Sequence, residues 1–277
     1  MLSDFVEAWP LFRDAFVTGW LLAALLALLG VLVVARDQIF IGAAVSQAST
    51  LGIALALVAG DVLGVAWADS DLFLTAMAVA ASVAAALLTT RRSHADAPSA
   101  EALTGWVFLF AASTSVLVVT RSPHGLEEIH RLLSSSIIGA SLGDVVVFSG
   151  LLATAGLVLV RVHRPLLLLA VDPAMAAAVG VPVARWDAVL SCMLGLVIGL
   201  AIPTAGVLYA VGCLVLPALV ARGLCREMRP MFVMAPAVAV GSAMVAFVVA
   251  HHYDLPPAQA TVALLCVLAV AARRRRR

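Results

Sequence analysis

Residues 188–221, AVLSCMLGLVIGLAIPTAGVLYAVGCLVLPALVA, form an apolar stretch without a single charged side chain. One helical membrane crossing needs about 20 apolar residues, so this stretch is too long for one crossing and about right for two short ones. Pro203, Thr204, Ala205 and Gly206 lie in its middle, and proline with glycine is typical of a turn or a break. The stretch therefore predicts two membrane helices that separate at residues 203–206.

Seven further uncharged runs each have approximately the length of one membrane helix. They are residues 15–35, 39–60, 72–90, 102–120, 145–160, 230–250 and 255–272. We therefore expect an all-α, polytopic helical membrane protein with about nine transmembrane helices in a single transmembrane domain over residues 1–277. Gly195 and Gly199 form a GxxxG pair, for which packing within the chain is favoured over a dedicated dimer face.

The composition supports a protein that lies in membrane lipid. Hydrophobic residues make up 64% of the 277 residues and charged residues 12%, against roughly 45–50% and about 25% in soluble domains. All 17 basic residues are arginine, and the lack of lysine excludes ATP binding through a Walker P-loop and Schiff-base catalysis. The net charge of +1 gives no reason to expect nucleic acid as a partner.

The arginines predict the orientation, because arginine near the ends of spans is retained in the cytoplasm. With nine spans and the N-terminus outside, all arginines except Arg13, Arg121 and Arg131 fall on the cytoplasmic side. The C-terminus is then cytoplasmic, and the tail Arg273–Arg277 would anchor it there.

Four polar side chains, Ser46, Gln47, Ser49 and Thr50, lie within the run at residues 39–60. A glutamine amide is costly to expose to lipid, so Gln47 should face another helix or a wet cavity. Two interpretations stay open: hydrogen bonding between helices, and the lining of a substrate path.

The segment DPAMAAAVGVP, residues 172–182, lies between charged flanks on the predicted cytoplasmic side. Asp172 suits a helix N-cap with Pro173 at the first helical position, and Gly180 with Pro182 would end the helix. The pattern predicts a helix of about seven residues, too short to span the membrane. It is either a docking element for a soluble partner or a passive connector.

His251, His252 and Asp254 follow the run at 230–250 on the predicted outer side. Imidazole and carboxylate groups bind transition metals. Adjacent histidines point to different faces of a regular element, however, so their spacing does not imply a shared site. These residues are weak candidates for a metal contact.

Four segments, in order, resemble motifs of the membrane permease subunits of bacterial ABC importers for zinc, manganese or iron. Residues 41–54, IGAAVSQASTLGIA, are similar to GDALSHAxLPGxA, and residues 166–187, LLLLAVDPAMAAAVGVPVARWD, are similar to FDPELAxxxGVPVxxL. Residues 206–222, GVLYAVGCLVLPALVAR, resemble GVLLVxALLVLPAATAR, and residues 253–261, YDLPPAQAT, resemble YLDLPSGAT. The four segments extend over most of the chain.

This resemblance implies a permease subunit of an ATP-driven importer of divalent metal ions in the bacterial cytoplasmic (inner) membrane. The expected partners are a separate ABC ATPase that binds ATP, a second permease copy or a paralogue, an extracytoplasmic metal-binding protein, and membrane lipid. The chain itself would be no enzyme and would bind no cofactor. The helix at residues 172–182 would couple to the ATPase through Asp172, Pro173, Met175, Ala177, Gly180 and Pro182.

The chain departs from the family at the positions of the intramembrane metal ligands. The family motif has aspartate and histidine there, four residues apart on one helix face, and this chain has Ala43 and Gln47. Three accounts stay open: a non-ligating half of a heterodimer, a looser site with Gln47, Ser46 and Cys213, or a cargo other than a bare divalent ion. The candidates for the translocation path are Ser46, Gln47, Ser49, Thr50, Thr204 and Cys213.

A secondary transporter or channel driven by an ion gradient is the alternative function. Such proteins usually keep ionisable groups within their spans, and the uncharged runs contain no acidic, basic or histidine side chain. An intramembrane enzyme would need a buried nucleophile with a base or a metal. The same composition counts against both alternatives.

Overall fold

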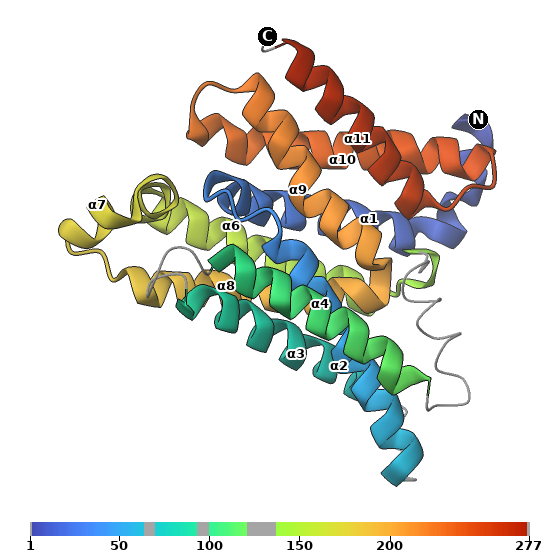
Figure 1. Ribbon diagram of the computed structural model, residues 1–277. Helices are drawn as coiled ribbons and strands as arrows, with labels where there is room; N and C mark the ends of the chain where they lie inside the picture. Colours follow the sequence, from blue (N-terminus) through green and yellow to red (C-terminus); the bar gives the residue numbers. More distant parts are fainter. Residues whose placement is uncertain (1, 64–69, 93–99, 121–136, 276–277) are drawn as a thin grey trace. The chain divides into compact units, whose positions relative to one another are not determined.

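A computed structural model describes residues 2–63, 70–92, 100–120 and 137–275 of the chain. In these residues every regular element is a helix, as expected for an all-α protein (Figure 1). Arg121, Arg131, Arg276 and Arg277, which contribute to the predicted orientation, lie outside the described residues.

The described part of the chain contains nine long helices and two short ones. They are α1 (Leu2–Ala35), α2 (Ile41–Leu63), α3 (Asp71–Arg92), α4 (Ala100–Val119), the 3-10 helix η2 (Ile137–Gly139), α6 (Leu142–Val171), α7 (Pro173–Ala178), α8 (Val183–Ala205), α9 (Val207–Leu224), α10 (Met228–His252) and α11 (Pro257–Arg275). By length and hydropathy, eight segments of the described residues are able to cross a membrane, and the longest, Val183–Leu224, includes both α8 and α9. The prediction of a polytopic helical membrane protein is confirmed.

The predicted break in the stretch at residues 188–221 is present at Gly206. Helix α8 ends at Ala205, and α9 begins at Val207. Pro203 lies in the last turn of α8, and its ring removes a backbone N–H that would otherwise donate within the helix. Gly206 has a φ of 81°, which glycine adopts readily because it has no Cβ.

Helices α1 and α6 extend by more than ten residues beyond the uncharged runs that predicted them. Helix α1 begins at Leu2 and includes Pro10, and α6 continues past Val160 to Val171. The chain bends within α6 at Val162, where φ is −123° and ψ is 23°, three residues before Pro165; proline is a common cause of such kinks. A charged side chain ends an uncharged run, but it does not end a helix.

The chain forms two compact units. Unit 1 comprises Met1–Asp37, Ser136–Val179 and Thr204–Arg277. In this unit α1 packs against α6, α9 and α10, and α11 packs against α9 and α10. The backbones of α1 and α9 approach so closely that a Cβ at Gly30 would overlap the carbonyl group of Leu214. Glycine at residue 30 is therefore a requirement of this packing.

Unit 2 comprises Gln38–Ser135 and Gly180–Pro203. Helix α2 packs against both α3 and α4. Gly195 and Gly199 of α8 lie against α3, where an added Cβ would come within 2.5 Å of Val83 Cα and 2.6 Å of Val79 Cα. The Ser82 hydroxyl of α3 donates to the Gly195 carbonyl at 2.6 Å. The prediction that the GxxxG pair packs within the chain is confirmed.

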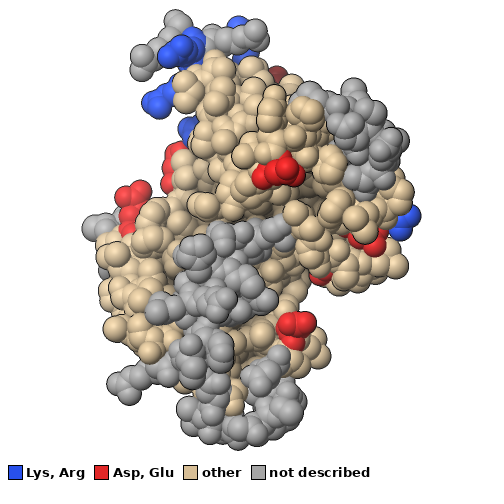
Figure 2. Space-filling view, turned by 90° about the vertical axis from the view of Figure 1, so that its right-hand side faces the viewer, with Lys and Arg blue, Asp and Glu red and all other residues tan. Residues whose placement is uncertain are grey.

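Many large apolar side chains are exposed on the surface of the described residues. Figure 2 shows one face on which charged residues are few. Large exposed apolar residues include Leu109 and Leu117 of α4 and Leu157 of α6. Such surfaces suit contact with lipid or with other membrane-embedded protein.

Candidate functional site

The three hydroxyl side chains of α2 are buried, and two of them donate hydrogen bonds to backbone carbonyls of the same helix. Ser46 Oγ donates to the Gly42 carbonyl at 2.8 Å, and Thr50 Oγ1 donates to the Ser46 carbonyl at 3.1 Å. Ser46, Ser49 and Thr50 are all buried, and Ser49 Oγ has no hydrogen-bond partner among the described residues. Serine and threonine in membrane helices commonly satisfy their hydroxyls in this way, by bonding a carbonyl one turn back.

Gln47 differs from these three residues because its side chain is partly exposed. Ala43, one turn earlier, is partly exposed as well, so these two residues lie on an accessible face of α2. The adjacent side of the helix packs through Ala44 and Ala48 against Ala85 of α3 and Val107 and Ala111 of α4. The structure thus separates Gln47 from the three hydroxyl residues beside it.

The two remaining path candidates, Thr204 and Cys213, belong to unit 1, whereas Gln47 belongs to unit 2. Thr204 is partly buried near the end of α8. Cys213 is fully buried in α9, one turn after Tyr209, whose hydroxyl donates to the Gly19 carbonyl of α1 at 2.8 Å. Within unit 1, Cys213 is therefore a core residue.

The predicted short helix is present as α7, at Pro173–Ala178. Asp172 is its N-cap, and the carboxylate accepts a hydrogen bond from the Met175 N–H at 2.9 Å. Pro173 occupies the first turn, and Gly180, with a φ of 87°, follows the last. The cap, the proline and the glycine therefore act as the sequence predicted.

Helix α7 has one buried side chain and a largely exposed surface. Ala176 is fully buried, and α7 packs against α6. All six coupling candidates are exposed: Asp172, Pro173, Met175, Ala177, Gly180 and Pro182. Met175, at 54% exposure, is a large apolar side chain on this surface. An exposed apolar group on a short capped helix suits contact with another protein.

The two histidines at the end of α10 point in different directions, as their adjacency predicts. His251 and Asp254 line a cavity of about 460 Å³ together with Phe12, Phe16 and Phe247. The His252 ring instead lies edge-on to Tyr253, with the ring centroids 4.9 Å apart. Among the described residues no group of three or more His, Cys, Asp or Glu side chains is placed to hold a metal ion.

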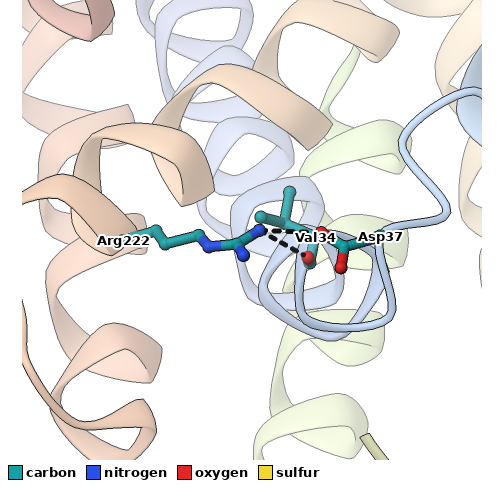
Figure 3. Close-up of polar contacts among 3 residues, drawn as sticks. All are labelled: Val34, Asp37 and Arg222. Carbon is teal, nitrogen blue, oxygen red and sulfur yellow. Dashed lines mark hydrogen bonds and ion pairs between the residues drawn. The ribbon is translucent and has the colours of Figure 1, made fainter. Parts of the chain in front are cut away.

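One polar contact connects parts of unit 1 that are far apart in sequence, and nothing in the sequence analysis indicated it. Arg222, in the last turn of α9, donates through Nη1 to Asp37 Oδ1 at 2.9 Å and to the Val34 carbonyl at 3.3 Å (Figure 3). Val34 lies in the last turn of α1, and Asp37 lies in the turn that follows the end of the helix at Ala35. A lone arginine after an apolar run suggests membrane orientation, and this signal does not reveal a partner so distant in sequence.

The model of the ABC 3 transport family matches residues 8–275. The chain belongs to this family. Proteins with similar sequences include the manganese transport system membrane protein MntC of Halalkalibacterium halodurans, which is 24% identical over 252 residues, corresponding to 91% of this chain and 82% of MntC. The chelated iron transport system membrane protein YfeD of Yersinia pestis is 23% identical over 247 residues, corresponding to 89% of this chain and 79% of YfeD.

The fold is similar to that of a chain in the solved structure of PsaBC from Streptococcus pneumoniae in complex with Fab. The TM-score is 0.80 at 17% identity, and the match covers 99% of this chain and 98% of the other. The ABC 3 assignment confirms the resemblance to metal ABC permeases that the four segments indicated. The chain is thus a membrane transport subunit of the metal ABC transporter family, and a multi-pass protein of the bacterial inner membrane.

Proposed function

We propose that this permease forms the membrane path of an ATP-driven importer of divalent metal ions, with manganese, iron and zinc as the candidate ions. Two permease subunits, as a second copy or a paralogue, would enclose the path. A separate ATPase would bind the cytoplasmic side, and an extracytoplasmic metal-binding protein would deliver the ion. The family assignment and the metal transport relatives support this proposal over a gradient-driven transporter or channel.

The main structural support for this proposal is that α7 is a short capped helix with an exposed apolar surface. It is anchored at one end by the Asp172 cap and on one side by buried Ala176, while Met175 and Ala177 remain exposed. In the chain, it joins α6 of unit 1 to α8 of unit 2. A force applied to α7 by a soluble ATPase would therefore reach both units through the backbone.

The accessible face of α2 supports a path with weak affinity for the ion. Gln47 presents a neutral amide, whose oxygen is a weaker ligand for a divalent ion than carboxylate combined with imidazole. Ala43 offers no ligand atom. A metal ion would therefore bind Gln47 only weakly and briefly. A stronger site would require ligands from the second subunit or from the cargo itself.

The test of coupling is the recovery of the ATPase with the permease from the native membrane. Met175→Asp places a charge on the exposed apolar surface of α7, so the amount of co-purified ATPase should fall by about tenfold, which corresponds to roughly 1.4 kcal/mol. Uptake of Mn²⁺, Fe²⁺ and Zn²⁺ by a deletion strain that carries the variant should fall in parallel.

Leu224→Asp is the matched control, because Leu224 is also a large apolar residue of unit 1 and is 45% exposed. It should retain both ATPase recovery and uptake. Isolation of the unaltered permease without any ATPase, together with normal uptake after residues 173–180 are scrambled, would contradict the proposed function.

A further inference from the structure

The chain passes between its two units four times, and three of these passages lie in the described residues: after Asp37, Val179 and Pro203. Each passage is at, or within three residues of, a position with positive φ, namely Asp37 (53°), Gly180 (87°) and Gly206 (81°). Asp254 is the only other such position in the described part of the chain. Left-handed backbone is thus concentrated where the chain leaves one unit for the other.

The passage at Asp37 differs from the other two in its residue type. Glycine adopts positive φ at little cost, and a Cβ at Gly180 would meet no atom within 4 Å. Aspartate tolerates this conformation better than most residues, but its Cβ still opposes it. The turn at Asp37 therefore benefits from support that the glycine positions do not need.

Arg222 supplies this support. The Asp37 N–H donates to the Val34 carbonyl at 3.2 Å, and Arg222 Nη1 donates to the same carbonyl and to the Asp37 carboxylate. The guanidinium thus binds both a backbone carbonyl and a side-chain carboxylate of the turn (Figure 3). A cation is also favourable at this place, because the C-terminus of a helix carries partial negative charge.

The arginine comes from a helix that is itself well fixed. Helix α9 packs against α1 and α11 within unit 1, and its backbone touches α1 at Gly30. The ion pair is exposed to solvent, with side-chain exposures of 46% for Arg222 and 75% for Asp37. Because exposed ion pairs contribute little to global stability, its effect should lie in the local conformation of the turn.

We propose that Arg222 is a positioning residue for transport: it holds the left-handed turn at Asp37, from which the chain enters unit 2 and α2 with its Gln47 face. A change at Arg222 would lower the transport rate without changing the affinity for the ion, because Arg222 acts through the turn. The part of this inference that concerns rate rests on the proposed function, whereas the part that concerns the turn does not.

The test uses the full-length permease with its partners and two measurements. Arg222→Gln should speed hydrogen exchange of the backbone amides at residues 36–41 and reduce the maximal rate of Mn²⁺ uptake by about fivefold, with KM unchanged, which corresponds to about 1 kcal/mol. Arg226→Gln removes the same charge from an exposed position four residues later and should change neither measurement.

A second variant separates the turn from a general loss of structure. Asp37→Gly in the Arg222→Gln background should restore most of the uptake rate, since glycine takes positive φ without support. Unchanged exchange in Arg222→Gln, an equal effect of Arg226→Gln, or no rescue by glycine would each overturn the proposal. Faster exchange in Arg222→Gln with no metal uptake by the unaltered permease would support the hold on the turn but contradict both the rate claim and the proposed function.

Discussion

Helices α7 and α2 both lie in segments that resemble the same family. The α7 segment matches the family motif in its main features, whereas the α2 segment lacks the two metal ligands of the motif. In α7 the features that the proposed docking would use are present: the Asp172 cap, the buried Ala176 and the exposed Met175. In α2 the helix and its accessible face are present, but Ala43 and Gln47 occupy the positions where the family motif has aspartate and histidine.

The difference teaches that docking and metal binding depend on different properties of a side chain. A docking surface depends on shape and exposure, which many apolar residues supply. A metal site depends on particular ligand atoms, and substitution by alanine removes them completely. Likeness of sequence therefore supports coupling to a partner more strongly than it supports a choice of cargo.

The largest expected effect tests the anchoring of α7. Ala176→Asp would bury an unpaired carboxylate, which costs about 3–5 kcal/mol when a buried charge has no partner. We expect α7 to lose its packing against α6, and both ATPase recovery and metal uptake to fall more than about tenfold.

Ala178→Asp introduces the same charge two residues later, at an exposed position of α7. It should leave the packing of α7 against α6 intact, because the carboxylate stays in water, and it should lower ATPase recovery and uptake no more than Met175→Asp does, because both charges lie on the exposed surface of α7. Equal losses in the two variants, at equal membrane levels, would show that Ala176 does not anchor the helix.

The next effect tests whether the accessible face of α2 would bind a metal ion if the two ligands of the family motif were restored. Ala43→Asp combined with Gln47→His places a carboxylate and an imidazole four residues apart on this face. Mn²⁺ binding to the purified permease, measured by calorimetry, should become about tenfold tighter or more, and release should slow. Unchanged affinity would show that the face does not meet the ion.

The smallest effect concerns Gln47 alone. If Gln47 binds the ion only weakly and briefly, Gln47→Ala should lower uptake by about twofold and by less than tenfold, because one neutral amide contributes little to binding an ion. Leu55→Ala, at an exposed position two turns later, serves as the control. Complete loss of uptake with normal membrane expression would make Gln47 essential and remove the contrast with α7.

Much of the fold could be predicted because each membrane helix is marked by a continuous run of apolar residues in the sequence. The break at Gly206 and the helix after Asp172 follow from proline, glycine and aspartate at positions where each has one strong preference. The lengths of α1 and α6 could not be predicted in this way, because Arg13 in α1 and Arg161 in α6 remain helical at the ends of apolar runs.

For the polar residues of α2, the sequence predicts which side chains share a helix face but does not predict which face is buried. Their periodicity indicates which of them share a face, and Gln47 is indeed set apart from Ser46, Ser49 and Thr50. Which face packs against α3 and α4 depends on the shapes of those helices, so the burial of the three hydroxyl residues needed the tertiary structure.

The sequence by itself determined the membrane class, the division of residues 188–221, the short capped helix within residues 172–182 and the absence of the family's ligand pair, since each depends on residues close together in the chain. The tertiary structure decided the cavity that His251 lines, the burial of Cys213 and the contact of Arg222 with the turn at Asp37. Arg222 and Val34 are 188 positions apart, and only packing of α9 on α1 brings them together. Local preferences build helices, but the contacts between helices depend on how whole surfaces fit.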